Sequence, residues 1–180
     1  MRRSLIIVVS LGSLLSVASG ASAQAVADAQ SVRGTLAFDA KANVGDFTGT
    51  TTKMTGKLEG ASALSGVRGW VEAPAKSLTT KNGHRDSDMA KSLEMGKYPA
   101  IRFDLDSVAP GAAQGDSTAV VLKGRFTLHG KTRAASIPGW VWITSKGARF
   151  RGAVPIDVKD YGVGGLTHFL VFKMNEMITV

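Results

Sequence analysis

The amino-acid sequence predicts an all-β fold, an eight-stranded antiparallel up-and-down barrel with one short helix between strands 3 and 4. Apolar and polar residues alternate in segment after segment, the connections are short and rich in turn residues, and helical periodicity is nearly absent. Eight sequential, hairpin-linked strands with one apolar face can close into a barrel, which removes exposed sheet edges. A sandwich of two sheets satisfies the same pattern and stays the structural alternative.

The strands are recognised by their two-residue alternation. Ile101, Phe103 and Leu105, for example, alternate with charged residues. Turn-forming residues separate the segments at Gly60, Pro110 and Gly111, His129 and Gly130, and Lys146 and Gly147. We therefore expect strands near residues 32–40, 46–59, 64–77, 99–108, 117–129, 132–145, 147–158 and 168–179.

One helix is expected between residues 82 and 95. Met89 and Leu93 stand four residues apart on one helical face, and Asp86 occupies the early turn that the helix dipole favours for an acid. Gly96 is the expected stop signal. We expect this helix to cover one end of the barrel.

Several glycines fall inside the expected strands. Strand glycine permits the sharp bends that a coiled barrel needs, and an inward glycine leaves room for a guest molecule. The glycine-rich segment 161–167 is expected to be a flexible loop at the ligand mouth. The strand glycines are Gly49, Gly56, Gly66, Gly69, Gly124 and Gly152.

Residues 1–23 have the pattern of a secretory signal peptide. Arg2 and Arg3 precede an apolar stretch from Leu5 to about Leu15, and the small residues 21–23 form a cleavage site. The apolar run is too short to span a bilayer. We expect cleavage near Ala23, which leaves one domain over residues 24–180 in the periplasm or the secreted space.

Composition narrows the classes of partner. The formal charge of +8 falls to +6 without Arg2 and Arg3, and this surplus is compatible with nucleic acid, anionic lipid headgroups or acidic partners. Because the basic residues are spread singly along the chain, the pattern favours a merely solvated basic surface over any of these. An exported protein does not meet nucleic acid in the cell, so we expect no nucleic-acid partner. Cysteine is absent, so no disulfide and no acylated cysteine is expected.

The sequence offers no pattern typical of an enzyme, a metal site or a bound cofactor, so we expect none of these. The histidines are His84, His129 and His168, and none belongs to a nucleophile elbow. His129 is expected on the surface of a hairpin turn. The spacing around His84 matches no familiar set of metal ligands. Arg85 and Asp86 are expected to fix their loop by hydrogen bonds to the backbone or to each other.

Four segments carry a resemblance to a known family. Residues 78–89 contain a threonine-bearing strand end followed by Arg-Asp, and residues 97–103 contain Tyr-Pro and an alternating strand that ends in Phe. Residues 122–132 contain a strand, a His-Gly turn and a Lys-Thr restart, and residues 156–162 end in an aromatic-glycine pair. The early Gly-Asp-Phe at 45–47 is compatible with the same pattern. Together these segments resemble the YceI-like family of exported polyisoprenoid-binding proteins.

The resemblance implies a lipocalin-like, eight-stranded barrel with an elongated cavity for an isoprenoid chain, such as a quinone or a polyprenyl phosphate. It loosely implies a homodimer, which exposed strand edges or a shared mouth could form. The sequence departs from the family pattern in residues 90–96, which lack the paired Phe before Tyr-Pro, and in its extra glycine after Tyr161.

An apolar chain that enters a dry tube gains about 25 cal/mol for each Å² of apolar surface buried. The ligand would contact the inward phases of the strands, where ordinary core packing is the alternative for each residue. Arg85 or Lys173 could meet a phosphate or carbonyl head group. The expected lining residues are Val67, Val71, Ile101, Phe103, Leu122, Phe126, Phe150 and Val154, with Trp140, Trp142, Phe169 and Val171 nearer the mouth.

The sequence therefore predicts a non-catalytic exported carrier of an isoprenoid lipid that makes transient contact with a membrane surface. Three alternatives stay open. The first is an interaction or stress-response module with a filled core. The second is a small outer-membrane barrel, which would need an apolar belt facing outward instead of the Lys, Arg and Asp present here. The third is a hydrolase or isomerase that uses His84 with Asp86.

Overall fold

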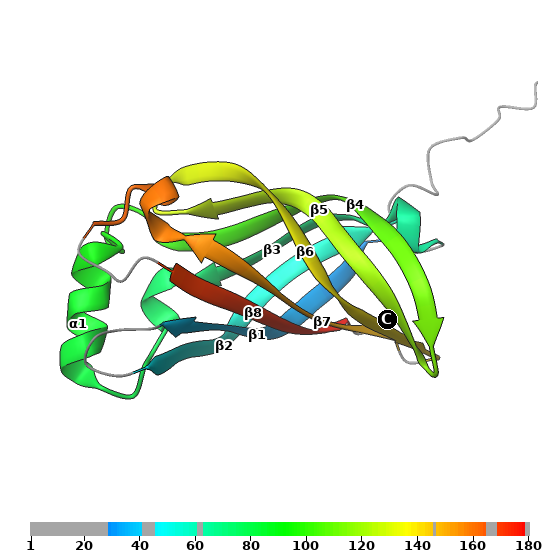
Figure 1. Ribbon diagram of the computed structural model, residues 1–180, viewed down its shortest axis with the longest axis horizontal. Helices are drawn as coiled ribbons and strands as arrows, with labels where there is room; N and C mark the ends of the chain where they lie inside the picture. Colours follow the sequence, from blue (N-terminus) through cyan, green and yellow to red (C-terminus); the bar gives the residue numbers. More distant parts are fainter. Residues whose placement is uncertain (1–28, 41–45, 61–62, 146, 165–168, 179–180) are drawn as a thin grey trace, which may run out of the picture.

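The computed structural model describes residues 29–40, 46–60, 63–145, 147–164 and 169–178, the last of these by its backbone alone. Its eight strands form one closed antiparallel barrel in which each strand pairs with its neighbours in sequence and β8 pairs with β1 (Figure 1). The predicted fold class is confirmed, and the sandwich is excluded. The strands are β1 (Gln30–Ala40), β2 (Phe47–Glu59), β3 (Arg68–Pro74), β4 (Ala100–Gln114), β5 (Ser117–Leu128), β6 (Lys131–Thr144), β7 (Gly147–Asp157) and β8 (Phe169–Ile178).

The fourth strand is longer than predicted. Pro110 pairs with Val120 inside the β4–β5 ladder, and the register shifts between Pro110 and Ala113. Gly111 and Ala112 lie outside the paired register, and proline is tolerated in a strand next to such a bulge. The prediction of a turn at Pro110 and Gly111 is therefore wrong. The chain turns instead after Gln114, where Gly115 adopts the left-handed conformation with a φ of 61°.

The third strand is shorter than predicted. Within the expected range 64–77, only β3 is extended, and it lies between two short 3-10 helices, η1 (Leu64–Gly66) and η2 (Ala75–Ser77). The second of these turns packs the chain against β2, where the hydroxyls of Thr51 and Ser77 are 2.7 Å apart. Thr50 and Thr79 then exchange backbone hydrogen bonds of 2.9 and 3.0 Å.

The helix predicted between residues 82 and 95 is α1 (Gly83–Ser92), at one end of the barrel (Figure 1). The side chain of Asn82 caps it by accepting a hydrogen bond from the backbone N–H of Arg85 at 3.1 Å. The helix ends earlier than the predicted stop at Gly96. Glu94, with a φ of 43°, takes the left-handed position that reverses the chain.

The two ends of the barrel are built differently. At the closed end lie α1, the His129–Gly130 turn and a third 3-10 helix, η3 (Val158–Tyr161). At the open end lie the start of β1, η1 and the β6–β7 connection (Figure 1). Among the described residues, no helix is long and apolar enough to cross a membrane.

Candidate ligand cavity

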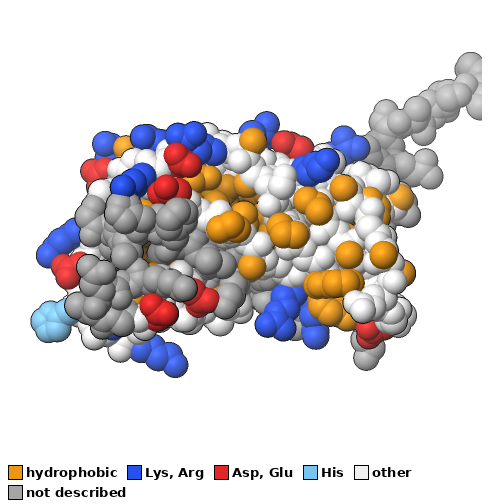
Figure 2. All heavy atoms as spheres, viewed as in Figure 1, with side chains coloured by type: hydrophobic (Ala, Val, Ile, Leu, Met, Phe, Trp, Pro, Cys, Tyr) orange, Lys and Arg blue, Asp and Glu red, His pale blue; other side chains and the backbone are white. Residues whose placement is uncertain are grey.

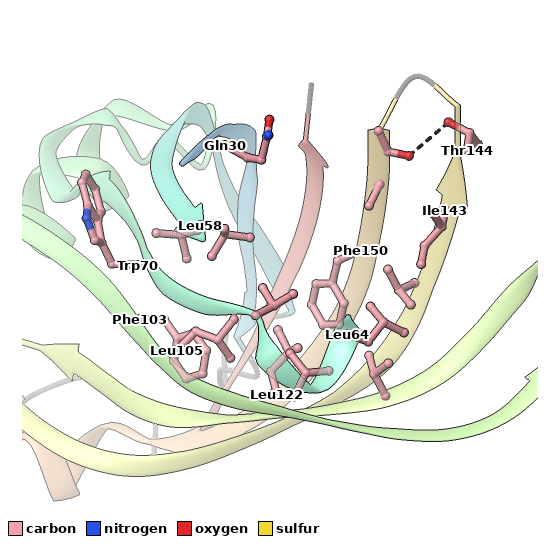
Figure 3. Close-up of a pocket in the computed structure, with 17 residues that line it drawn as sticks. Gln30, Leu58, Leu64, Trp70, Phe103, Leu105, Leu122, Ile143, Thr144 and Phe150 are labelled. Atoms are coloured by element: carbon pink, nitrogen blue, oxygen red, sulfur yellow. Dashed lines mark hydrogen bonds between the residues drawn. The ribbon is translucent and has the colours of Figure 1, made fainter. Parts of the chain in front are cut away.

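The interior of the barrel contains an apolar cavity of about 180 Å³ toward its open end (Figure 3). Its wall consists almost wholly of aliphatic and aromatic side chains. Its polar members are Gln30 and Thr144. The lining residues are Gln30, Leu58, Leu64, Val67, Trp70, Val71, Phe103, Leu105, Val108, Val120, Leu122, Val141, Ile143, Thr144, Gly147, Ala148 and Phe150.

Five residues that the sequence predicts as lining residues border this cavity. They are Val67, Val71, Phe103, Leu122 and Phe150. They come from β3, the residue before it, β4, β5 and β7, so strands far apart in the sequence bring them together. The structure establishes that these five residues lie in the wall. That they contact a ligand stays a prediction.

Three other predicted lining residues lie deeper in the barrel. Ile101 and Phe126 are buried around a much smaller void, whose wall also includes Val71 and Phe103. Val154 is buried in the hydrophobic core and borders neither space. Val71 and Phe103 border both spaces.

The expected elongated tube is therefore divided into two spaces. Two inward glycines of the barrel are covered by aromatic rings. A side chain on Gly49 would meet the ring of Phe38, and one on Gly152 would meet the ring of Phe150. Neighbouring aromatic rings thus occupy the room that these glycines leave. The prediction that inward glycine provides free volume for a guest is corrected at these positions.

The two tryptophans predicted near the mouth lie on the other phase of their strand. Val141 and Ile143 line the cavity, so Trp140 and Trp142, which alternate with them in β6, face outward. Trp140 is 37% exposed. Phe169 and Val171 belong to β8, opposite Asp157 and Pro155, and their side chains lie outside the described part of the structure.

The two predicted head-group residues are not brought to the mouth. Arg85 lies in α1 at the closed end, with its guanidinium 4.3 Å from the centroid of the Phe47 ring. The side chain of Lys173 lies outside the described part of the structure. The described part of the 161–167 segment, residues 161–164, begins with the last residue of η3 at the closed end. Tyr161 and Val163 are buried there. The prediction that this segment forms the mouth is therefore wrong for these residues.

Most of the lining residues that sequence reasoning missed belong to the same inward phases. Leu105 and Val120 continue the alternation of Phe103 and Leu122, so extending each phase along its strand would have found them. Val141 was missed because the residues predicted in β6, Trp140 and Trp142, lie on the opposite phase. Gln30 and Leu64 had no such signal, because one begins a strand and the other lies in a 3-10 turn. Their place depends on how the ends of the barrel fold.

Polar contacts hold the rim of the cavity. The hydroxyl of Thr144 donates to the carbonyl oxygen of Gly147 at 3.1 Å, which closes the β6–β7 connection (Figure 3). Trp70 lies under the guanidinium of Arg102, 4.5 Å from the ring centroid. Arg102 also donates to Asp104 at 2.8 and 2.9 Å, and this hydrogen bonding raises the pKa of Arg102. The cation therefore stays charged beside Trp70.

At the closed end, Asp86 ties α1 to the preceding loop. It accepts hydrogen bonds from the hydroxyl of Thr79 at 2.8 Å and from the backbone N–H and hydroxyl of Thr80 at 2.8 and 2.6 Å. The hydrogen bond from the Thr80 side chain is the main cause that lowers the pKa of Asp86. The expectation that Asp86 fixes this loop is confirmed, whereas Arg85 packs on Phe47 instead.

His129 is less exposed than predicted. Its side chain is 11% exposed, with Nε2 2.7 Å from a carboxylate oxygen of Glu94 and Nδ1 3.1 Å from the carbonyl oxygen of Tyr161. Its ring also meets the ring of Tyr98 edge-on, with the centroids 4.6 Å apart. His129 therefore joins the turn after β5 to the segment after α1. Among the described residues, no group of three or more His, Asp or Glu could hold a metal ion.

The fold and the cavity define a lipocalin-like class of protein, closed antiparallel barrels with an apolar cavity that opens at one end. The YceI-like domain model matches residues 22–180. The chain therefore belongs to the YceI-like family. A search of curated proteins found no match.

Solved structures share the fold at low sequence identity. BcnA of Burkholderia cenocepacia is 18% identical, with a TM-score of 0.67 over 80% of this chain and 94% of BcnA. A polyisoprenoid-binding domain from Saccharophagus degradans is 12% identical, with a TM-score of 0.65 over 85% of this chain and 98% of that domain. The Campylobacter jejuni YCEI protein is 14% identical, with a TM-score of 0.59 over 73% of this chain and 84% of that protein.

Proposed function

We propose that this protein is a non-catalytic carrier that holds the apolar end of an isoprenoid lipid in the cavity at the open end of its barrel. The observation that carries the proposal is the apolar wall of an enclosed space that opens at one end. The family membership and the likeness to a polyisoprenoid-binding domain support the same class of ligand. A quinone and a polyprenyl phosphate both have such a tail.

The size of the cavity limits how much of the lipid it takes. An engineered protein cavity of about 150 Å³ binds benzene, so a space of about 180 Å³ accepts a branched tail of roughly five to ten carbons. Val71 and Phe103 border both this cavity and the much smaller void, so we expect the tail to end at these side chains. A longer isoprenoid would leave the rest of its chain at the mouth, where Ile143 is 61% exposed.

The proposed cellular setting is the periplasm or the secreted space. The signal-peptide pattern of residues 1–23 supports it. A soluble carrier with such a cavity would exchange its lipid by transient contact with a membrane surface. The closed barrel removes the strand edges that a homodimer could have used, and a shared mouth is the other arrangement that was expected.

A specific observation bears on each alternative function. The oxygens of Asp86 are occupied by Thr79 and Thr80, which does not favour a catalytic pair with His84. Exposed charges such as Arg33, Lys57 and Lys123 on the outward phases do not favour contact with lipid tails around the barrel. The presence of the cavity does not favour an interaction or stress-response module with a filled core.

The same substitution at two adjacent residues of β5 tests the proposal. Val120 lines the cavity, and Val121 lies on the outward phase. A phenyl ring from Val120→Phe would enter the cavity, whereas the ring of Val121→Phe would lie outside the barrel. We expect Val120→Phe to lose most of the binding of farnesol and of the fluorescent probe N-phenyl-1-naphthylamine, and Val121→Phe to keep it.

Mass spectrometry of organic extracts supplies the native ligand. The wild-type protein and both variants would be purified from the native host under gentle conditions. We expect an isoprenoid lipid in the wild type and in Val121→Phe, and much less of it in Val120→Phe. An extract without lipid from the wild type, together with no binding of either probe, would contradict the proposal.

A further inference from the structure

The outer face of the barrel beside the mouth carries two tryptophans, each paired across the ladder with an arginine. Trp140 lies opposite Arg151, and Trp142 lies opposite Arg149, on the outward phase of β6 and β7. Both arginines are exposed, and Trp142 is half-buried. These four residues form one continuous surface, because directly opposed side chains on one face of an antiparallel pair are neighbours.

Ile143 extends this surface to the cavity itself. Trp140 and Ile143 are the exposed large hydrophobic side chains of the described part of the chain. Both lie in the part of β6 nearest the open end. Ile143 is 61% exposed and also lines the cavity. Figure 2 shows hydrophobic and basic side chains next to one another at the end of the molecule opposite α1. We call Trp140, Trp142, Ile143, Arg149 and Arg151 the mouth surface.

The open end is also more basic than the closed end. Arg33, Lys57 and Arg68 are exposed on the other strands near the mouth, and the described acids of that end include Glu59, Asp106 and Asp116. None of these three cations, nor Arg149 or Arg151, lies within 4.0 Å of the carboxylate of a described acid. At the closed end, three basic groups have acidic partners, with Lys91 paired to Asp88, His129 to Glu94 and Arg133 to Asp160. Nearer the mouth, Asp106 is paired to Arg125 and not to one of these five cations.

We propose that the mouth surface docks on an anionic lipid bilayer and so turns the open end of the cavity toward the membrane. Tryptophan is favoured at the membrane interface, and arginine is attracted to anionic headgroups. An exposed aliphatic side chain at the rim beside them, here Ile143, can enter the apolar edge of the bilayer. In this orientation a lipid tail passes from bilayer to cavity without crossing water. The purpose of the docking rests on the proposed carrier function, whereas the surface is an independent observation.

Vesicle binding of the purified protein tests the docking. Vesicles of phosphatidylcholine with phosphatidylglycerol would be compared with vesicles of phosphatidylcholine alone, in low and high salt. We expect binding to the anionic vesicles, weaker binding in high salt, and a shift of tryptophan fluorescence to shorter wavelength. Arg149→Gln with Arg151→Gln should weaken this binding about tenfold or more.

The matched control removes two charges from the other end of the barrel. Lys76 in η2 and Lys159 in η3 are exposed, and Lys76→Gln with Lys159→Gln should leave vesicle binding within about twofold of the wild type. Ile143→Ser keeps all charges and should also weaken binding and reduce the fluorescence shift. Equal losses in both charge variants would overturn the proposal, because they would indicate attraction by total charge alone.

Two further outcomes separate this proposal from its neighbours. Probe binding in buffer without vesicles should stay intact in Arg149→Gln with Arg151→Gln, so a failure of docking is distinguishable from a failure of the carrier function. Absence of binding to anionic vesicles would overturn the docking proposal. Binding to native membranes that protease treatment of those membranes abolishes would instead indicate a protein partner, and would also overturn it.

Discussion

The closed half and the open half of the barrel use the same strands and the same inward phase, yet one is filled and the other holds a cavity. Toward the closed end the inward side chains include large ones, namely Phe38, Met54, Phe126 and Leu128, each at most 3% exposed. Toward the open end the inward residues of β4 to β6 include the aliphatic Leu105, Val108, Val120 and Val141 beside Phe103, Leu122 and Ile143. Valine side chains fill less of a barrel interior than phenylalanine or methionine, which is consistent with a cavity there.

The elements at the two ends enlarge this difference. At the closed end, residues from α1 and the segment after it, Met89, Leu93 and Met95, are buried, as are Val158 and Tyr161 of η3. Burial also raises the pKa of Tyr161. The open end has the short turn η1, whose Leu64 lines the cavity without filling it. The contents of a barrel of this size therefore depend on its end segments as much as on its strands.

Alanine substitutions of two phenylalanines give the largest expected effect. Phe126 is 1% exposed and meets the ring of Tyr161 edge-on at 5.9 Å, so Phe126→Ala should lower the free energy of unfolding by about 3–5 kcal/mol. Phe150 borders the cavity and has fewer packing partners on that side, so Phe150→Ala should cost about 2 kcal/mol. Urea unfolding of both variants measures the difference. Equal losses would show that the two halves are packed alike.

Enlarging an inward side chain tests the same difference between the two halves in the opposite way, because it asks which half has room for extra volume. Ile137 and Val141 share the inward phase of β6, and Ile137 is fully buried whereas Val141 lines the cavity. Ile137→Phe should cost about 1–3 kcal/mol because the packed neighbours must move. Val141→Phe should cost less than about 1 kcal/mol, because the cavity takes the ring. Its thermal unfolding should change little while probe binding falls, and a loss of stability equal to that of Ile137→Phe would contradict the comparison.

The alternation of apolar residues was enough to predict the fold, because a period of two settles both the strands and the face that each side chain occupies. It failed where local turns act against it. Pro110 and Gly111 resemble a turn but lie at a bulge, and residues 64–66 and 75–77 extend the β3 pattern although they form 3-10 turns. Such choices depend on pairing with distant strands, which a short window of sequence does not contain.

The candidate site was predictable only by phase. Phe103, Leu122 and Phe150 were placed correctly in the wall because their strands alternate clearly. Ile101 and Phe126 have the same pattern but border the much smaller void instead, since depth along the barrel is set by strand stagger and not by alternation. The position of the mouth could not be predicted either, because the alternation of residues does not indicate which end segments cover the barrel and which leave it open.

Removing the charge of Asp86 should weaken the closed end alone. Asp86→Asn loses charge-assisted hydrogen bonds to Thr79 and Thr80 and should cost about 1–2 kcal/mol at neutral pH. The pKa of Asp86 is lowered in the folded state, so its stabilisation is present above the ordinary carboxyl pKa of about 4 and is lost as the pH falls through the folded value. Urea unfolding of wild type and variant between neutral and acidic pH should therefore converge at low pH. Probe binding should stay unchanged, and its loss would mean that the two halves are coupled.

The smallest expected effect concerns Arg102 on the outer surface, where it contacts a residue of the cavity rim. Its guanidinium binds Asp104, lies 3.4 Å from a carboxylate oxygen of Glu72 and covers Trp70. These side chains are about one-third exposed, so the ion pairs contribute little, and Arg102→Lys should cost about 0.5–1 kcal/mol, mainly through the lost stacking. Because Trp70 borders the cavity, the variant should also change probe affinity slightly. Lys91→Ala, which removes an ion pair more than 70% exposed at the closed end, should leave both quantities unchanged, and a similar change in probe affinity there would show that surface charge alone tunes the cavity.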